Sequence, residues 1–159
     1  MTPVLLGRIQ TRLFVLFTIG LLWTLVITPF LLLSTGDGYE LALSIDGGLG
    51  EVYKLTIAAL VITAIFGCLF WEPVYHFLMQ FRWEKDWPAF FHLVSVFPEC
   101  LTTFLLLHIG FLNPLPTTYV PGLAYLFLFF STWIITWLAA NGPMKIFFVR
   151  WRFFGGRII

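Results

Sequence analysis

Charged residues are scarce in this sequence. Only 11% of its 159 residues are Asp, Glu, Lys or Arg, whereas 60% are hydrophobic. A soluble domain usually carries about 25% charged residues. The composition therefore excludes an ordinary soluble domain and indicates an integral membrane protein. Long apolar runs that cross a membrane are α-helical, because a helix bonds every backbone group within its own segment. We expect an all-α integral membrane fold.

A concentration of positive charge is also missing. Nine Lys and Arg residues stand against eight Asp and Glu, for a net charge of +1. Nucleic-acid binding needs many clustered cations to neutralise phosphates, so nucleic acid is excluded as a partner. The two cysteines, Cys68 and Cys100, lie in apolar stretches without CxxC spacing. They are typical of small buried hydrophobic residues.

The common catalytic motifs are absent. The sequence contains no GxSxG elbow, no HExxH pair and no phosphate-binding loop, which are the patterns that mark many hydrolases and nucleotide-binding enzymes. The segments between the apolar runs are too short for a catalytic domain. We therefore expect a protein that is not an enzyme, although an intramembrane enzyme remains open.

Four apolar runs are long enough to cross a bilayer, which takes about 20 residues. They cover approximately 13–33, 55–79, 89–112 and 120–141. The first run is too long for the apolar core of a signal peptide, about 7–15 residues. We predict four transmembrane helices in a single membrane domain that covers residues 1–159.

Lys and Arg residues alternate along the chain. They occur at Arg8 and Arg12, in the 80–88 connection and in the tail 142–159, whereas the 34–54 loop is acidic and the 113–119 turn has no charge. Positive segments stay in the cytoplasm during membrane insertion. This pattern predicts cytoplasmic termini, an outer loop at 34–54 and a multi-pass protein of a bacterial cytoplasmic membrane.

Small residues recur every four positions in the first two runs. Such spacing lets helix backbones approach closely in lipid, so we expect the two ridges to face each other or a partner, although chance spacing would produce the same pattern. The ridges consist of Gly20, Thr24 and Thr28 in the first run and of Ala59, Thr63 and Gly67 in the second.

Glu99 is the strongest single candidate for a functional residue. It lies roughly 15 Å from the cytoplasmic start of the third run, near the bilayer midplane, at about 1.5 Å per helical residue. Ionisable groups at that depth are costly and usually functional. We expect Ser95, Thr102 or Thr103 to hydrogen-bond its carboxyl group, or a partner chain to share it. No second charged residue is expected at that depth.

Glu72, His76 and His92 are expected to converge at the inner boundary, joined by Asn141. His and carboxylate ligands suit a metal ion, but di-iron bundles use Glu-x-x-His on two helices, and this chain offers Glu-x-x-x-His once. His76 and His92 would also suit the two axial positions of one haem. We expect no cofactor, and leave a metal or haem at these residues as an alternative.

The C-terminal tail combines aromatic residues with Arg150, Arg152 and Arg157. This combination suits an anionic lipid surface or the cytoplasmic face of a partner.

The sequence favours a non-enzymatic integral membrane subunit. We expect it to act as an anchor, assembly or accessory component of a larger membrane complex, in contact with lipids and with other subunits or copies of itself. Two alternatives remain: a small ion or proton pathway centred on Glu99, and a redox anchor with a single haem between His76 and His92.

Overall fold

The described part of the chain is helical throughout. The computed structural model describes residues 4–34, 49–81, 89–111 and 122–149, and these contain no strand. In chain order the elements are α1 (Leu5–Val15), the π-helical η1 (Leu16–Gly20), α2 (Leu21–Ser34), α4 (Leu49–Phe66), the π-helical η2 (Gly67–Trp71), α5 (Glu72–Gln80), α6 (Ala89–Val94), α7 (Val96–His108), α8 (Gly122–Asn141) and α9 (Pro143–Phe147).

Within these residues, four continuous helical segments are long and apolar enough to cross a membrane. They are Leu5–Leu31, Leu49–Gln80, Phe90–His108 and Gly122–Phe147. The predicted all-helical architecture with four membrane-length helices is confirmed. The cytoplasmic placement of both termini stays a prediction.

The largest difference from the predicted bounds is at the N-terminus. The first segment begins at Leu5 and not near residue 13, so Arg8 and Arg12 lie inside the helix. The hydropathy of the sequence falls at these two arginines, but the helix continues through them because their charges are paired inside the bundle. The sequence places them in front of the apolar run, and the structure places them within the first helical segment.

Two other ends also extend beyond the apolar runs, whereas the third segment, Phe90–His108, lies within the expected 89–112. Residues 49–54 of the expected outer loop form the first turns of α4. The last segment continues past Asn141 into α9, which occupies the start of the expected tail. The helices thus extend into polar sequence that a hydropathy count assigns to connections.

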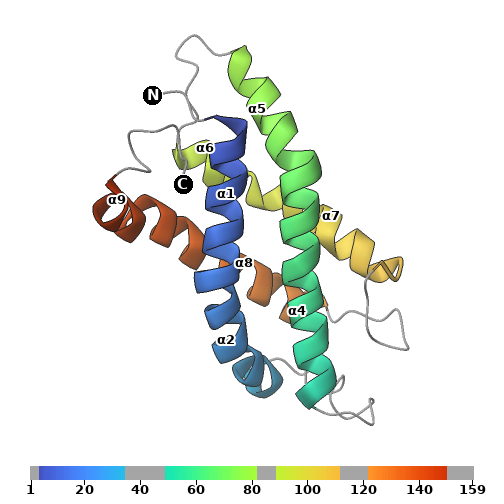
Figure 1. The fold of residues 1–159 in the computed structure, drawn as a ribbon. Helices are drawn as coiled ribbons and strands as arrows, with labels where there is room; N and C mark the ends of the chain where they lie inside the picture. The colour runs from blue at the N-terminus through green and yellow to red at the C-terminus, as the bar shows by residue number, and fades with distance from the viewer. Residues whose placement is uncertain (1–3, 35–48, 82–88, 112–121, 150–159) are drawn as a thin grey trace.

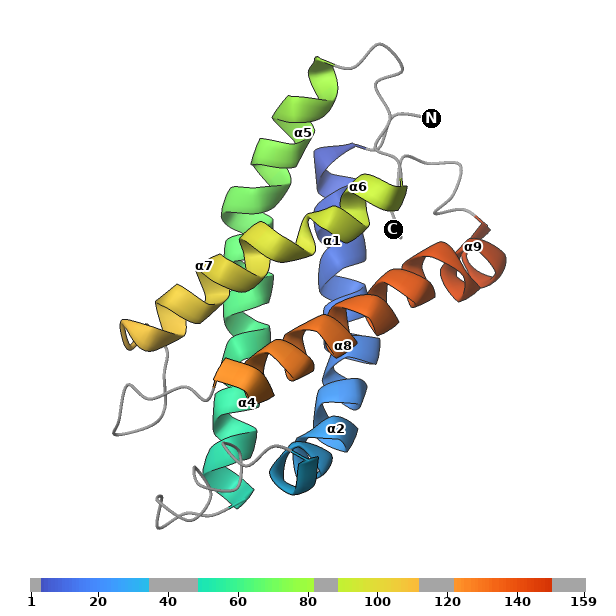
Figure 2. The same ribbon diagram turned by 180° about the vertical axis from the view of Figure 1, so that it is seen from behind.

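Two steep limbs are crossed by two oblique ones (Figures 1 and 2). The α1–α2 limb and the α4–α5 limb stand side by side in both views, and the α6–α7 and α8 limbs cross them at a slant. The start of α1 and the end of α5 lie at the same end of the bundle, and the end of α2 and the start of α4 lie at the other (Figure 1). Successive limbs therefore run in opposite directions, as spans with short connections must.

Three irregular turns interrupt the limbs. The π-helical turn η1 begins shortly after Arg12, and η2 ends directly before Glu72. Between α6 and α7 the helix breaks at Ser95, and Pro98 follows in the first turn of α7. Single π-helical turns and prolines bend helices and often occur at functional sites. Here they surround the buried charges.

The apolar core lies between α4, α7 and α8. Ile62 and Leu107 are completely buried there. Phe129 and Trp133 of α8 stack with ring centroids 5.9 Å apart, and the Tyr125 hydroxyl donates to the Cys100 carbonyl oxygen at 3.0 Å. Rigid aromatic rings from α8 therefore fill the centre and pack α8 against α4 and α7.

The residues of the two small-residue ridges contact several limbs, and that the two ridges face each other stays a prediction. Thr28 is fully buried and donates to Thr56 Oγ1 at 3.2 Å. Gly20 lies next to Thr136 of α8 and Leu60 of α4, where an added Cβ would be 3.4 Å and 3.6 Å from their side chains. Thr24 and Thr63 donate to carbonyl oxygens of their own helices. Polar side chains thus lie at the helix contact without disrupting the helices.

Candidate functional site: a buried chain of arginines and glutamates

Four charged side chains form a continuous chain inside the bundle. Arg8 and Arg12 come from α1, Glu72 from the first turn of α5 and Glu99 from the first turn of α7. Arg8 and Arg12 are four residues apart and lie on one face of α1. We call these four residues the ion cluster.

Arg12 holds Glu99 with both arms of its guanidinium group. Nη1 donates to Glu99 Oε1 at 3.1 Å, and Nη2 donates to Glu99 Oε2. This two-bond geometry is the strongest form of arginine–carboxylate pair, because the planar group matches both oxygens. Nη1 also donates to Glu72 Oε1 at 3.2 Å. Arg12 therefore bridges the two glutamates.

Glu72 is shared between both arginines. Arg8 Nε donates to Glu72 Oε2 at 2.6 Å, while Arg12 binds the other oxygen. Arg8 Nη1 also lies 2.8 Å from the sulfur of Met79. The order of contacts is Arg8, Glu72, Arg12, Glu99, and the four formal charges cancel.

The ion cluster is sealed from the surface of the bundle. Its side chains are at most 9% exposed, and those of Glu72 and Glu99 are 2% and 1% exposed. A buried pair gains little over apolar residues of the same size, but removal of one partner leaves an uncompensated charge, at a cost of about 3–5 kcal/mol. The pairing is therefore essential once these residues are buried.

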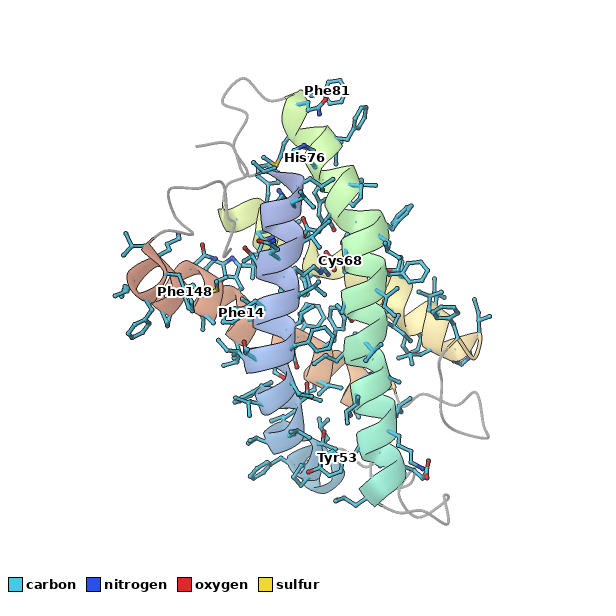
Figure 3. The ribbon with its side chains drawn as sticks, in the orientation of Figure 1. Phe14, Tyr53, Cys68, His76, Phe81 and Phe148 are labelled. Atoms are coloured by element: carbon cyan, nitrogen blue, oxygen red, sulfur yellow. The ribbon has the colours of Figure 1, made fainter. Side chains whose placement is uncertain are left out.

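Local backbone geometry makes room for the Arg12 guanidinium. A Cβ atom at Gly67 would overlap the Arg12 Cζ, Nε and Nη2 atoms, so the glycine leaves the space that the guanidinium occupies. Arg12 Nη2 also lies 3.4 Å from the Thr63 carbonyl oxygen. Cys68, the next residue of η2, lies on the side of its limb that faces α1 (Figure 3). Gly67 was expected to bring helix backbones together, and in the structure it admits a side chain.

Aromatic rings surround the ion cluster. The Arg12 Cζ lies 5.7 Å from the Trp133 ring centroid, a cation–π distance that favours the positive charge in a dry environment. His92 packs on the same indole with its ring centroid 6.0 Å away. Tyr75 is buried and stacks on Trp71. Trp133 therefore connects the cluster to the aromatic core.

Two residues of this site were missed by the sequence analysis. Arg8 and Arg12 were counted as cytoplasmic flanking charges, and the expectation of no second charge at the depth of Glu99 was wrong, because Arg12 binds Glu99 directly. Their four-residue spacing beside Leu5, Leu6 and Ile9 was the available signal, since it places both arginines on one face of a helix.

The expected hydroxyl partners of Glu99 make other hydrogen bonds. Ser95 Oγ donates to the His92 carbonyl oxygen at 2.8 Å. Thr102 Oγ1 donates to main-chain oxygens of its own helix and accepts from Trp71 Nε1 at 3.2 Å. Thr103 Oγ1 lies 3.4 Å from Thr63 Oγ1. An arginine, rather than these hydroxyls, compensates the carboxylate.

No hydrogen bond or ion pair among the described residues joins Glu72, His76, His92 and Asn141 to one another. His92 packs on Trp133, the ring that Arg12 also contacts. His76 lies one turn beyond Glu72 on α5 (Figure 3), and its Nδ1 is buried without a hydrogen-bond partner among the described residues. Asn141 instead donates to the Trp137 carbonyl oxygen and accepts from Lys145. The described residues contain no group of three or more His, Cys, Asp or Glu placed to hold a metal ion.

The tail arginines Arg150, Arg152 and Arg157 lie outside the described residues. The residues just before them contact the bundle. Phe148 packs edge-on against Phe14 of α1 with ring centroids 5.4 Å apart (Figure 3), and Met144 of α9 is buried. The beginning of the tail is therefore docked on the first limb.

The ion cluster has two possible uses: it can lock the limbs together, and its carboxylates can exchange protons within a hydrogen-bonded chain.

Comparison of the chain with protein-family models, curated proteins and solved structures gives no match.

Proposed function

We propose that this chain is a non-enzymatic integral membrane subunit that acts as an anchor or assembly component of a larger membrane complex. The observation that carries the proposal is the internal pairing of Arg8, Glu72, Arg12 and Glu99. Each charge has an opposite partner within the chain, so three limbs are held together from the inside. Such a bundle needs no partner to neutralise its charges and can act as a rigid scaffold.

The outer surface suits lipid and other membrane helices. Leu69, Phe70, Phe77 and Phe81 project from the η2–α5 part of the second limb and are 76%, 52%, 58% and 74% exposed; Phe81 points away from the bundle at its end (Figure 3). Membrane helices associate by shape and packing, because lipid removes the hydrophobic incentive. Contacts with partner subunits would be made through such faces.

Cytoplasmic termini in a bacterial cytoplasmic membrane remain part of this proposal. Arg8 and Arg12 are paired with glutamates. They are therefore weaker evidence for the orientation of the chain in the membrane than unpaired flanking charges would be. The 80–88 connection and the residues after Asn141 still carry Lys and Arg, whereas 34–48 carries none. The positive-inside rule therefore predicts the same orientation without the two N-terminal arginines.

Purification from native membranes tests the scaffold role. A tagged chain extracted in mild detergent should elute with another membrane protein at fixed stoichiometry, as measured by mass analysis of the intact assembly. Arg12→Gln should lower the recovery of that assembly, because it leaves Glu99 unpaired. Glu51→Gln is the matched control, since Glu51 pairs with Lys54 near the surface. A folded wild-type chain that elutes as a monomer would contradict the proposal.

A proton pathway centred on Glu99 is the second candidate, and one observation favours it. Glu72 and Glu99 both accept hydrogen bonds from Arg12 Nη1, at 3.2 Å and 3.1 Å. The arginines stay protonated and hold the two carboxylates close together, so the pathway has two neighbouring proton-binding groups in place of a single isolated carboxylate. Relays of this kind commonly run through intramembrane carboxylates.

Proton flux into liposomes tests this candidate. The purified chain should dissipate an imposed pH gradient faster than empty liposomes, Glu99→Gln should abolish the increase, and Glu51→Gln should preserve it. The helical content of Glu99→Gln in the same liposomes, compared with that of the wild-type chain, checks that a loss of flux does not come from unfolding. Equal flux in wild-type and empty liposomes would rule the pathway out for the isolated chain.

A further inference from the structure

His76 is a half-buried histidine on the same face of α5 as Glu72. The two residues are four positions apart, a spacing that places Cβ atoms about 5–6 Å from each other on one side of a helix. Met79 follows three positions later on that side. Arg8 of α1 donates to Glu72 Oε2 and also to the Met79 sulfur. This face of α5 therefore packs against α1, and along the helix His76 lies between the two residues that Arg8 contacts.

The imidazole ring of His76 has a nitrogen that the bundle leaves unused. Its Nδ1 is buried and has no hydrogen-bond partner among the described residues, whereas the residue as a whole is only partly buried. A neutral imidazole donates at one ring nitrogen and accepts at the other, and imidazoles commonly act as proton shuttles. A ring that is partly exposed and has a free nitrogen can take up a proton and pass it on.

His76 also lies at the end of the bundle toward which the ion cluster extends. It is four residues before the end of α5, about 6 Å along the helix axis at about 1.5 Å per residue. The end of α5 and the start of α1 share this end of the bundle (Figures 1 and 3). Arg12 holds Glu99 and Glu72 together, and His76 is one turn nearer to the end of α5 than Glu72. The three proton-binding groups therefore follow one another from Glu99 toward this end.

We propose that His76 is the proton-transfer residue that links Glu72 to water at this end of the bundle. The inference rests on the proton pathway proposed above and adds its point of entry. His76 binds a proton from water and becomes an imidazolium, then releases a ring proton to a Glu72 carboxylate oxygen and returns to the neutral form. The two side chains share no hydrogen bond in the structure, so the transfer needs a rotation of the ring or one bridging water molecule. Arg8 and Arg12, the charged side chains that α1 places beside α5, stay protonated and do not carry the proton.

Proton flux into liposomes tests the assignment by comparing two histidines. His76→Gln should slow the dissipation of an imposed pH gradient several-fold, because the amide binds no proton. His108→Gln is the matched control and should leave the flux unchanged, since His108 is exposed at the last residue of α7 and stacks on Phe104. A flux that is abolished in Glu99→Gln but unchanged in His76→Gln would overturn the role of His76 and leave the pathway in place. Wild-type flux no faster than that of empty liposomes would overturn both.

His76→Glu separates proton transfer from a structural role. A carboxyl group also binds a proton, but it titrates at lower pH than an imidazole. Because the residue delivers protons only while it is protonated, flux falls as the pH rises through its titration. We therefore expect flux in His76→Glu to be several-fold faster than in His76→Gln at low pH, and to be half-maximal at a lower pH than in the wild-type chain. Helical content in the same liposomes measures folding. A folded His76→Glu chain with the flux and pH profile of His76→Gln would overturn the proposal.

Discussion

Arg12 is the residue on which the interior depends. Its guanidinium contacts both glutamates, the Thr63 carbonyl oxygen and the face of Trp133. A single arginine therefore joins the first limb to the other three. Because the group is planar and carries several donors, a lysine at this position would keep the charge but lose the two-bond contact with Glu99.

Glu99→Gln should destabilise the chain strongly. The amide keeps the size of the side chain but removes the charge that Arg12 faces, and loss of one member of a buried pair costs about 3–5 kcal/mol. The free energy of unfolding in mixed micelles measures the loss. The control Glu51→Gln should change that free energy by less than about 1 kcal/mol, because Glu51 belongs to an exposed pair.

The double variant Arg12→Gln with Glu99→Gln separates charge from packing. It removes one charge of each sign, so it should recover part of the stability lost in Glu99→Gln alone. A double variant as unstable as the sum of the two single variants would show that Arg12 and Glu99 act independently, in conflict with the observed pair.

Gly67→Ala should displace the Arg12 side chain. The new methyl group would occupy the space of the guanidinium, and Arg12 cannot move without weakening its bonds to Glu99. We expect a loss of about 1–3 kcal/mol, the usual range for overpacking, measured by unfolding in mixed micelles. The matched control is Gly50→Ala, at a helical position where an added Cβ meets no atom within 4 Å. Equal stability of the two variants would contradict the role of Gly67.

At the scale of elements, the α2–α4 contact combines close packing with side-chain hydrogen bonds. Thr28 and Thr56 share a bond across it, and the Tyr53 hydroxyl donates to the Leu25 carbonyl oxygen at 3.0 Å. Hydrogen bonds between membrane helices are individually weak, about 0.6 kcal/mol on average. Their contribution here is to fix the register of two helices that small residues bring together.

Thr28→Val and Thr56→Val test the link between these helices. Because each change removes the same hydrogen bond, the double variant should lose less stability than the sum of the single variants, by about 0.6 kcal/mol. A double-mutant cycle of unfolding free energies gives this coupling. Additive effects would mean that the hydroxyl contact does not hold α2 to α4.

At the scale of the whole molecule, the direction of the limbs determines which connections lie together. The start of α1 and the end of α5 share one end of the bundle (Figure 1). The connection after α5 contains Arg82 and Lys85, while residues 34–48 contain acidic residues and no Lys or Arg. These charges predict which end faces the cytoplasm.

Cysteine labelling from outside intact cells should reach a probe at Asp46 and fail to reach one at Glu84. The native Cys68 and Cys100 are buried, so their background labelling should be low. Labelling of both positions after the membrane is permeabilised is the control for reactivity. The reverse pattern, with Glu84 labelled in intact cells and Asp46 protected, would refute the predicted orientation.

Much of the architecture follows from the sequence because it depends on local properties. Four apolar runs of sufficient length determined four membrane-length helices, since a backbone in lipid must satisfy its own hydrogen bonds. The sequence also marked Glu72 and Glu99 as candidate functional residues, because an ionisable group in an apolar run is costly without a partner. Gly20, Thr24 and Thr28 marked a face that does pack against the other limbs.

Only the tertiary structure decided which charges pair. Arg12 and Glu99 are 87 positions apart in the sequence, and hydropathy assigns the arginine to the water phase, because an unpaired arginine lowers the score of any window that contains it. The carboxylate that compensates it comes from another limb, so it does not change the mean hydropathy calculated for the sequence around Arg12. The sequence determined that buried carboxylates need partners, and the crossing of α1, α5 and α7 determined that the partners are Arg8 and Arg12.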